Sequence, residues 1–110
     1  MKLIAFKSLL ERVLPNKVVY ETWPVGKAPA LPYICYMTTG TDTFGADNIT
    51  YFAAWTTRVE LYTEHKDFTL EASLEDALNA AGLYWTRDES YISDEKLYLT
   101  IYEVTLHGRE

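Results

Sequence analysis

The sequence predicts an α+β domain, with a mainly antiparallel sheet, a long β-hairpin and two helices packed on one face of the sheet. Three observations predict this class. The stretch from Ile49 to Thr63 is dense in β-branched and aromatic residues, which suit a half-buried strand. Two segments with apolar residues at helical spacing stand before and after the strand-rich middle. The chain has 110 residues, 48% of them hydrophobic, which indicates a single domain spanning 1–110.

The first elements follow from periodicity and from chain-breaking residues. Residues 2–14 form the first predicted helix, because their apolar residues recur at helical spacing and Pro15 ends the pattern. A brief strand is predicted at 18–20. Residues 21–31 are predicted to cross the domain as a loop, because prolines and a glycine interrupt them. Within this loop Trp23 is interpreted as a satellite core residue or, as the less favoured alternative, as an exposed contact.

A long hairpin is predicted in the middle of the chain. Residues 33–38 form its first strand and residues 39–48 a polar tip of about ten residues, because glycine, aspartate and asparagine cluster there. Phe44 in this tip could pack back on the hairpin or reach a partner. The second strand, Ile49 to Thr63, either projects as one arm of the hairpin or bends at the pair Ala53 and Ala54.

The second helix is predicted after a charged turn. Asp67 is its expected N-cap, with Thr69 as the competing choice, and Gly82 is placed to end it. Glu71 and Glu75 are interpreted as part of its exposed, solvated face. The apolar stripe that faces the sheet consists of Leu70, Leu74, Ala77, Leu78 and Ala81.

The remaining residues, 83–85, 90–92 and 96–106, are predicted as two or three strands. In the last of them Leu97, Leu99 and Ile101 face one way, while Tyr98, Tyr102 and Val104 face the other. A strand that is apolar on both faces needs a cover on each, and we expect a second subunit to provide one. The predicted contact surface comprises Trp23, Phe44, Asp47, Tyr98 and Tyr102.

Composition and motifs argue against several functions. Sixteen acidic and ten basic residues give a net charge of -6, which disfavours sequence-specific nucleic-acid binding. The histidines, His65 and His107, lack metal-ligand spacing, and no nucleophile elbow or phosphate loop is present. We therefore expect no enzyme activity, no catalytic residues, no cofactor and no metal. Cys35 is expected to be a buried structural thiol, and no apolar run is long enough to predict a membrane span.

Four stretches resemble a known protein family. They are Ala-Pro-Ala-Leu-Pro-Tyr-Ile-Cys-Tyr at 28–36, Phe-Gly-Ala-Asp-Asn at 44–48, Glu-Leu-Tyr-Thr-Glu-His-Lys-Asp at 60–67 and the closing Leu-Tyr-Leu-Thr-Ile-Tyr-Glu-Val. The chain resembles the tail terminator, or tail completion, proteins of long-tailed bacteriophages and prophages, which are small head-to-tail joining proteins. The resemblance covers most of the chain, and its motifs are structural rather than catalytic.

The resemblance implies a virion protein of the tail that is assembled in the host cytoplasm. Its copies would form a homo-oligomeric ring, expected to be a hexamer, that caps the tail tube and meets the head-completion protein. The hairpin would contact the neighbouring subunit or the tail tube protein. The acidic balance would suit a lumen through which DNA slides without sticking. Two alternatives stay open: another head-tail connector or minor tail protein, and a monomeric cytoplasmic module that binds a ligand or peptide near Trp23 and Phe44.

Overall fold

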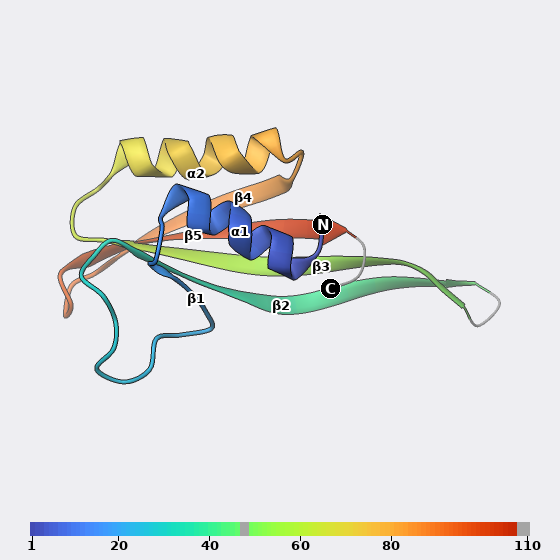
Figure 1. Cartoon of the computed structure of the whole chain (residues 1–110), viewed down its shortest axis with the longest axis horizontal. Helices are drawn as coiled ribbons and strands as arrows, with labels where there is room; N and C mark the ends of the chain where they lie inside the picture. The colour runs from blue at the N-terminus through green and yellow to red at the C-terminus, as the bar shows by residue number, and fades with distance from the viewer. Residues whose placement is uncertain (47–48, 108–110) are drawn as a thin grey trace.

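The computed structural model describes residues 1–46 and 49–107, and the side chains of 1–40 and 54–106 among them. Both helices lie on the same face of one sheet (Figure 1). The sheet has the strand order β1-β2-β3-β5-β4, in which β1 runs parallel to β2 and the other neighbours are antiparallel. The predicted α+β class is confirmed. The elements are α1 (Leu3–Val13), β1 (Val18–Tyr20), β2 (Tyr33–Ala46), β3 (Ile49–Thr63), α2 (Phe68–Ala80), β4 (Tyr84–Ile92) and β5 (Leu97–His107).

The core lies between the two helices and the sheet. α1 contributes Phe6 and Leu10, and α2 contributes Leu74 and Leu78, all of them without solvent exposure. Alternation along the strands brings every second strand residue to this face. The strand residues of the core are Val18, Ile34, Tyr36, Val59, Leu61, Tyr102, Val104 and Leu106.

Both predicted ends of α2 are confirmed. Asp67 is the N-cap, and its Oδ1 accepts a hydrogen bond of 3.0 Å from the backbone N–H of Leu70. Gly82 follows the helix with φ +71°, a conformation that favours glycine. The N–H of Leu83 then donates to the carbonyl of Leu78 at 3.1 Å, which closes a Schellman motif. These two caps set where the chain leaves the helix layer and enters β4.

The hairpin differs from its prediction in one respect. β2 does not end at residue 38 but pairs with β3 as far as Ala46 opposite Ile49, so the ten-residue polar tip at 39–48 is wrong. The pairing shifts register between Thr38 and Gly40 and again between Phe44 and Gly45. Such bulges accommodate glycine within a strand, whereas a sequence pattern interprets the same residue as a turn.

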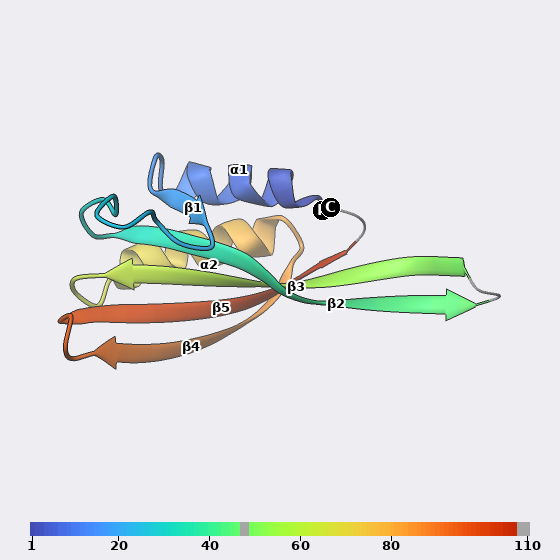
Figure 2. The ribbon, with the colours of Figure 1, turned by 90° about the horizontal axis from the view of Figure 1, so that it is seen from below.

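Part of the hairpin projects beyond the other strands. The pairing of β3 with β5 reaches Ala54 opposite His107, so residues 43–46 and 49–53 pair only with each other among the described residues. We call this two-stranded segment the arm; it leaves the sheet as a narrow ribbon (Figure 2). At roughly 3.3 Å per residue its β3 half reaches about 17 Å. Of the two alternatives for the long strand, projection as a hairpin arm is the one observed.

The arm makes the molecule elongated. Its extents are 52 × 30 × 24 Å and its radius of gyration is 15.1 Å. A compact chain of this length would have a radius of gyration of roughly 13 Å. The chain therefore presents more surface than a compact domain of the same size.

The C-terminal part forms two strands. The separate segments predicted at 83–85 and 90–92 are one strand, β4, which pairs along its length with β5. The alternation predicted for the last strand is confirmed, since Tyr102 and Val104 belong to the helix-facing core whereas Leu99 and Ile101 lie on the opposite face. Neither helix of the described residues lies on this opposite face (Figure 1).

Candidate functional site

The sheet face opposite the helices is the main candidate for a contact surface, and we call it the open face. Strand register places Tyr33, Tyr62 and Leu99 in one row across it. The next row contains Cys35, Glu60 and Ile101. The open face is defined by seven partly exposed residues: Tyr33, Met37, Arg58, Glu60, Tyr62, Leu99 and Ile101. No helix of the described chain covers these side chains.

Aromatic stacking and an ion pair order the centre of the open face. The rings of Tyr33 and Tyr62 stack with centroids 4.9 Å apart. The hydroxyl of Tyr62 donates a hydrogen bond of 3.0 Å to Glu60, and Arg58 Nε lies 3.0 Å from the same carboxylate. Burial, followed by the Glu60 carboxylate, raises the pKa of Tyr62 well above its usual range. The face thus combines rigid rings with paired charges, a composition typical of protein contact surfaces.

The loop at 21–32 covers one end of this face. The Trp23 ring meets Tyr33 edge-on at 6.1 Å between centroids. Beneath the loop Cys35 is only 4% exposed, and burial raises the pKa of its thiol to about 11, with a hydrogen bond to the Trp23 backbone acting in the other direction. The predicted burial of Cys35 is confirmed. A neutral, buried thiol of this kind is a weak nucleophile near neutral pH.

Tyr102 does not belong to a contact surface. Its side chain is 0% exposed, its ring lies 5.6 Å from that of Trp85, and its hydroxyl donates a hydrogen bond of 2.8 Å to Glu75. Burial and this carboxylate together raise the pKa of Tyr102 far above its usual range. The predicted interface role of Tyr102 is therefore wrong. Both faces of β5 are apolar, and the sequence did not reveal which of them the helices cover.

The other predicted interface residues are scattered. Trp23 is half-buried beside the open face. Tyr98 is half-buried on the helix-facing side, where its ring lies 4.9 Å from that of Tyr91. The backbone of Phe44 belongs to the arm, opposite Phe52 in the hairpin pairing. Asp47 lies outside the described residues. The structure therefore does not bring these predicted residues together at one site.

An ionic network that was not predicted links α2 to β4. Glu71 is only 2% exposed, and Lys66 Nζ lies 2.8 Å from both of its carboxylate oxygens. One guanidinium nitrogen of Arg87 lies 2.7 Å from Glu75 and 3.4 Å from Glu71. Lys66 also contacts Glu89 on β4. The interpretation of Glu71 and Glu75 as a solvated face is wrong, because β4 places Arg87 alongside α2 and encloses both carboxylates.

The network gives the fold a defined pH range. The hydrogen bond from Lys66 holds the pKa of Glu89 below its ordinary 4.5, so this pair stabilises the fold above that pH and the contribution is lost in acid. Burial alone would lower the pKa of Lys66, but hydrogen bonds to Glu71 and Glu89 raise it above 10.5 on balance. The contribution of Lys66 to the stability of the fold is complete below pH 10.5 and is lost as the pH rises further.

Replacing Glu71 with glutamine is expected to lower the free energy of unfolding by about 1–2 kcal/mol, because two partly exposed cations lose their shared carboxylate. Denaturant titration at neutral pH measures the change. The matched control is Asp76→Asn, an exposed position on the same helix, which should change stability by less than about 0.5 kcal/mol. Equal effects of the two substitutions would contradict the network.

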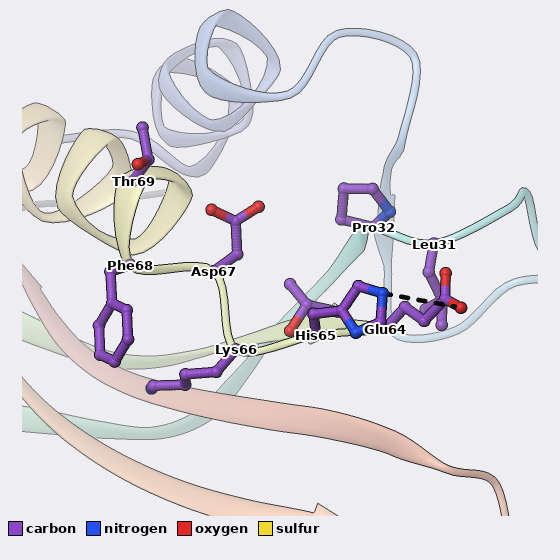
Figure 3. A pocket seen from close by; sticks show the side chains of 9 residues that line it. Leu31, Pro32, Glu64, His65, Lys66, Asp67, Phe68 and Thr69 are labelled. Atoms are coloured by element: carbon purple, nitrogen blue, oxygen red, sulfur yellow. Dashed lines mark ion pairs between the residues drawn. The ribbon is translucent and has the colours of Figure 1, made fainter.

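A hollow of about 400 Å³ lies where α2 begins, between the segment after β3 and the cis Leu31–Pro32 peptide (Figure 3). The side chains of Glu64 and His65 in its wall are 70% and 88% exposed, and Nε2 of His65 lies 4.0 Å from a carboxylate oxygen of Glu64. Asp67 already satisfies the N-terminus of the helix, so that end offers little attraction to an anion. Glu64 and His65 therefore lie in solvent at the rim of the hollow.

Two further findings concern the described residues. Within 1–46 and 49–107, no group of three or more His, Cys, Asp or Glu side chains is placed to hold a metal ion. In the same part of the chain, neither helix has the length and apolar character needed to cross a membrane.

Comparison with known proteins gives a structural match. No protein-family model matches the sequence, and no match is found among curated proteins. Among solved structures, the chain is similar to one from the structure described as "Virion of native gene transfer agent (GTA) particle", with a TM-score of 0.64. The two chains are 12% identical, and the match covers 89% of this chain and 82% of the other. The two chains therefore share a fold over most of their lengths.

Proposed function

We propose that this chain is a structural protein of a phage-type virion, and that it acts there as the tail terminator. Copies form a ring that caps the tail tube and joins it to the head-completion protein. The observation that carries the proposal is the shared fold with a chain of a gene transfer agent virion, over 89% of this chain. The four sequence stretches that resemble tail terminators support the same assignment.

The arm supports an assembly role. A two-stranded ribbon is marginally stable alone in water, so a projecting one gains stability from a partner that covers it. Its sequence is mainly apolar, with Phe44, Ile49, Tyr51 and Phe52, and Asp47 is the single charge between residues 43 and 53. An arm of this composition suits insertion against another protein of the virion. We assign it to the tail tube protein or to the neighbouring subunit.

The open face supplies a second contact surface in this proposal. Leu99 and Ile101 are partly exposed at its centre, next to the ordered pair Tyr33 and Tyr62. Rigid aromatic residues contribute contact area at low entropic cost. We propose that the open face packs on the tail tube protein along the axis of the ring. The role is a non-catalytic one, and the net charge of -6 suits a ring lumen through which DNA moves.

The proposal is tested with purified tail tube protein that polymerises in solution. Adding this chain should stop tube growth and leave rings at tube ends, visible by negative-stain electron microscopy. A control uses the same amount of a chain that lacks the arm, with residues 43–53 replaced by a two-residue Asn-Gly turn. Tubes that grow equally long with and without the intact chain would contradict the terminator role.

A further inference from the structure

Charge is unevenly divided between the two sides of the molecule. Residues 1–32 contain five basic and two acidic side chains, a net charge of +3. Residues 64–103 contain ten acidic and three basic ones, a net charge of -7. The first segment forms α1, β1 and the loop at one side of the sheet, whereas the second runs from α2, in the middle of the molecule, to β4 and β5 at the other side (Figure 2). The molecule is therefore electrostatically bipolar across its sheet.

The basic side contains an apolar groove. A hollow of about 500 Å³ is lined by Leu3, Ile4, Lys7, Tyr20 and Tyr36, between α1 and the strands β1 and β2. Ile4 is 75% exposed and Tyr20 is 41% exposed, although both are large and apolar. Lys7 adds a positive charge at the rim. Apolar surface of this kind next to a charge is typical of a protein contact site.

The acidic side ends in an open sheet edge. β4 pairs only with β5 among the described strands, so the backbone groups along its outer edge are available to a partner. Tyr84 at one end of β4 is 72% exposed and Tyr91 near the other end is 54% exposed. Asp88 on β4 and Asp94 in the following turn are also exposed. Their like charges disfavour pairing of two β4 edges with each other.

We propose that copies of this chain associate head to tail, with the basic α1–β1 side of one copy against the acidic β4 edge of the next. The groove around Lys7 would receive an exposed tyrosine of β4, and Lys2 and Lys7 would face Asp88 and Asp94. The two surfaces differ, so the contact is heterologous and repeats around a closed ring. This inference rests on the proposed ring and assigns its lateral contact. Asp88 pairs with Ile101, so the contact includes the β4 margin of the open face and leaves the centre of that face for another virion protein.

Charge reversal tests the proposal without touching the core. The basic-side variant carries Lys2→Glu and Lys7→Glu, and the acidic-edge variant carries Asp88→Lys and Asp94→Lys; all four positions are exposed. Each variant alone should lose at least about 100-fold in association at low salt, because like charges then face each other. Mixing the two variants should restore assembly, and the assemblies should contain both variants in equal numbers, since each mixed contact again joins opposite charges. Native mass spectrometry measures both. The control is Glu64→Lys, an exposed position that lines the hollow beside Pro32 rather than the β4 edge, and it should assemble as the unmodified chain does.

The outcomes separate this inference from the proposed function. If the mixture of the two variants assembles in alternating copies and neither variant assembles by itself, the head-to-tail contact is supported. If each variant assembles by itself to the same extent as the unmodified chain, the head-to-tail contact is overturned. If these variants still stop tube growth normally, the terminator role is retained. An unmodified chain that does not self-associate at low salt, either free or on tubes, overturns the lateral contact. If that chain also leaves tube length unchanged, the terminator role fails too.

Discussion

Tyr102→Ala is expected to lower the free energy of unfolding by about 3–5 kcal/mol, the range for removing a large aromatic side chain from a core. Tyr102 is completely buried and contacts Trp85 and Glu75. The substitution leaves a cavity beneath α2 and removes one of the two donors to Glu75, with Arg87 as the one that remains. Urea or guanidinium titration with a folded-state tryptophan signal measures the loss.

Tyr102→Phe separates the ring from the hydroxyl. It keeps the packing but removes the hydrogen bond to Glu75, so a loss of about 1–2 kcal/mol is expected. A Tyr102→Ala protein that stays as stable as the unmodified chain yet fails to bind tubes would contradict this account. It would return Tyr102 to the contact surface where sequence analysis placed it.

Leu99→Lys combined with Ile101→Lys is expected to weaken binding to the tail tube by about 100-fold or more, because two central apolar contacts become charged. Both side chains are partly exposed, and Ile101 lies opposite Glu60 in the strand register. The long lysine stems can cover the neighbouring apolar surface, and Ile101→Lys gains an acidic neighbour. Folding should therefore be retained, as measured by circular dichroism and thermal unfolding.

The matched control adds the same two charges on the helix side. Thr69→Lys and Ser73→Lys are exposed positions on α2. This control should bind tubes as the unmodified chain does. Loss of folding in the Leu99 and Ile101 variant, with a stable control, would instead place those two residues in the core of the subunit.

Local signals in the sequence were the reliable ones. Asp67 and Gly82 predicted the ends of α2 because capping depends on the residues within one turn. The alternation along β5 was equally local and was confirmed. Gly40 and Gly45 predicted a turn but lie at bulges, because glycine suits both and only the pairing with β3 decides between them.

Long-range placement was not available from the sequence. Glu71 becomes buried because Arg87, sixteen positions later, is brought against it when β4 joins the sheet. Similarly, Tyr102 and Leu99 lie on equally apolar faces of β5, and the packing of α1 and α2 decides which face is core. The exposed apolar surface of β5 is therefore the open face with Leu99 and Ile101, and not the face that contains Tyr102.

Tail length in particles made without this chain tests the central claim most directly. The account predicts that electron micrographs of lysates from a deletion strain show over-long tail tubes without heads, and that supplying the intact gene restores tails of normal length. Tails of normal length joined to heads in the deletion strain would contradict it.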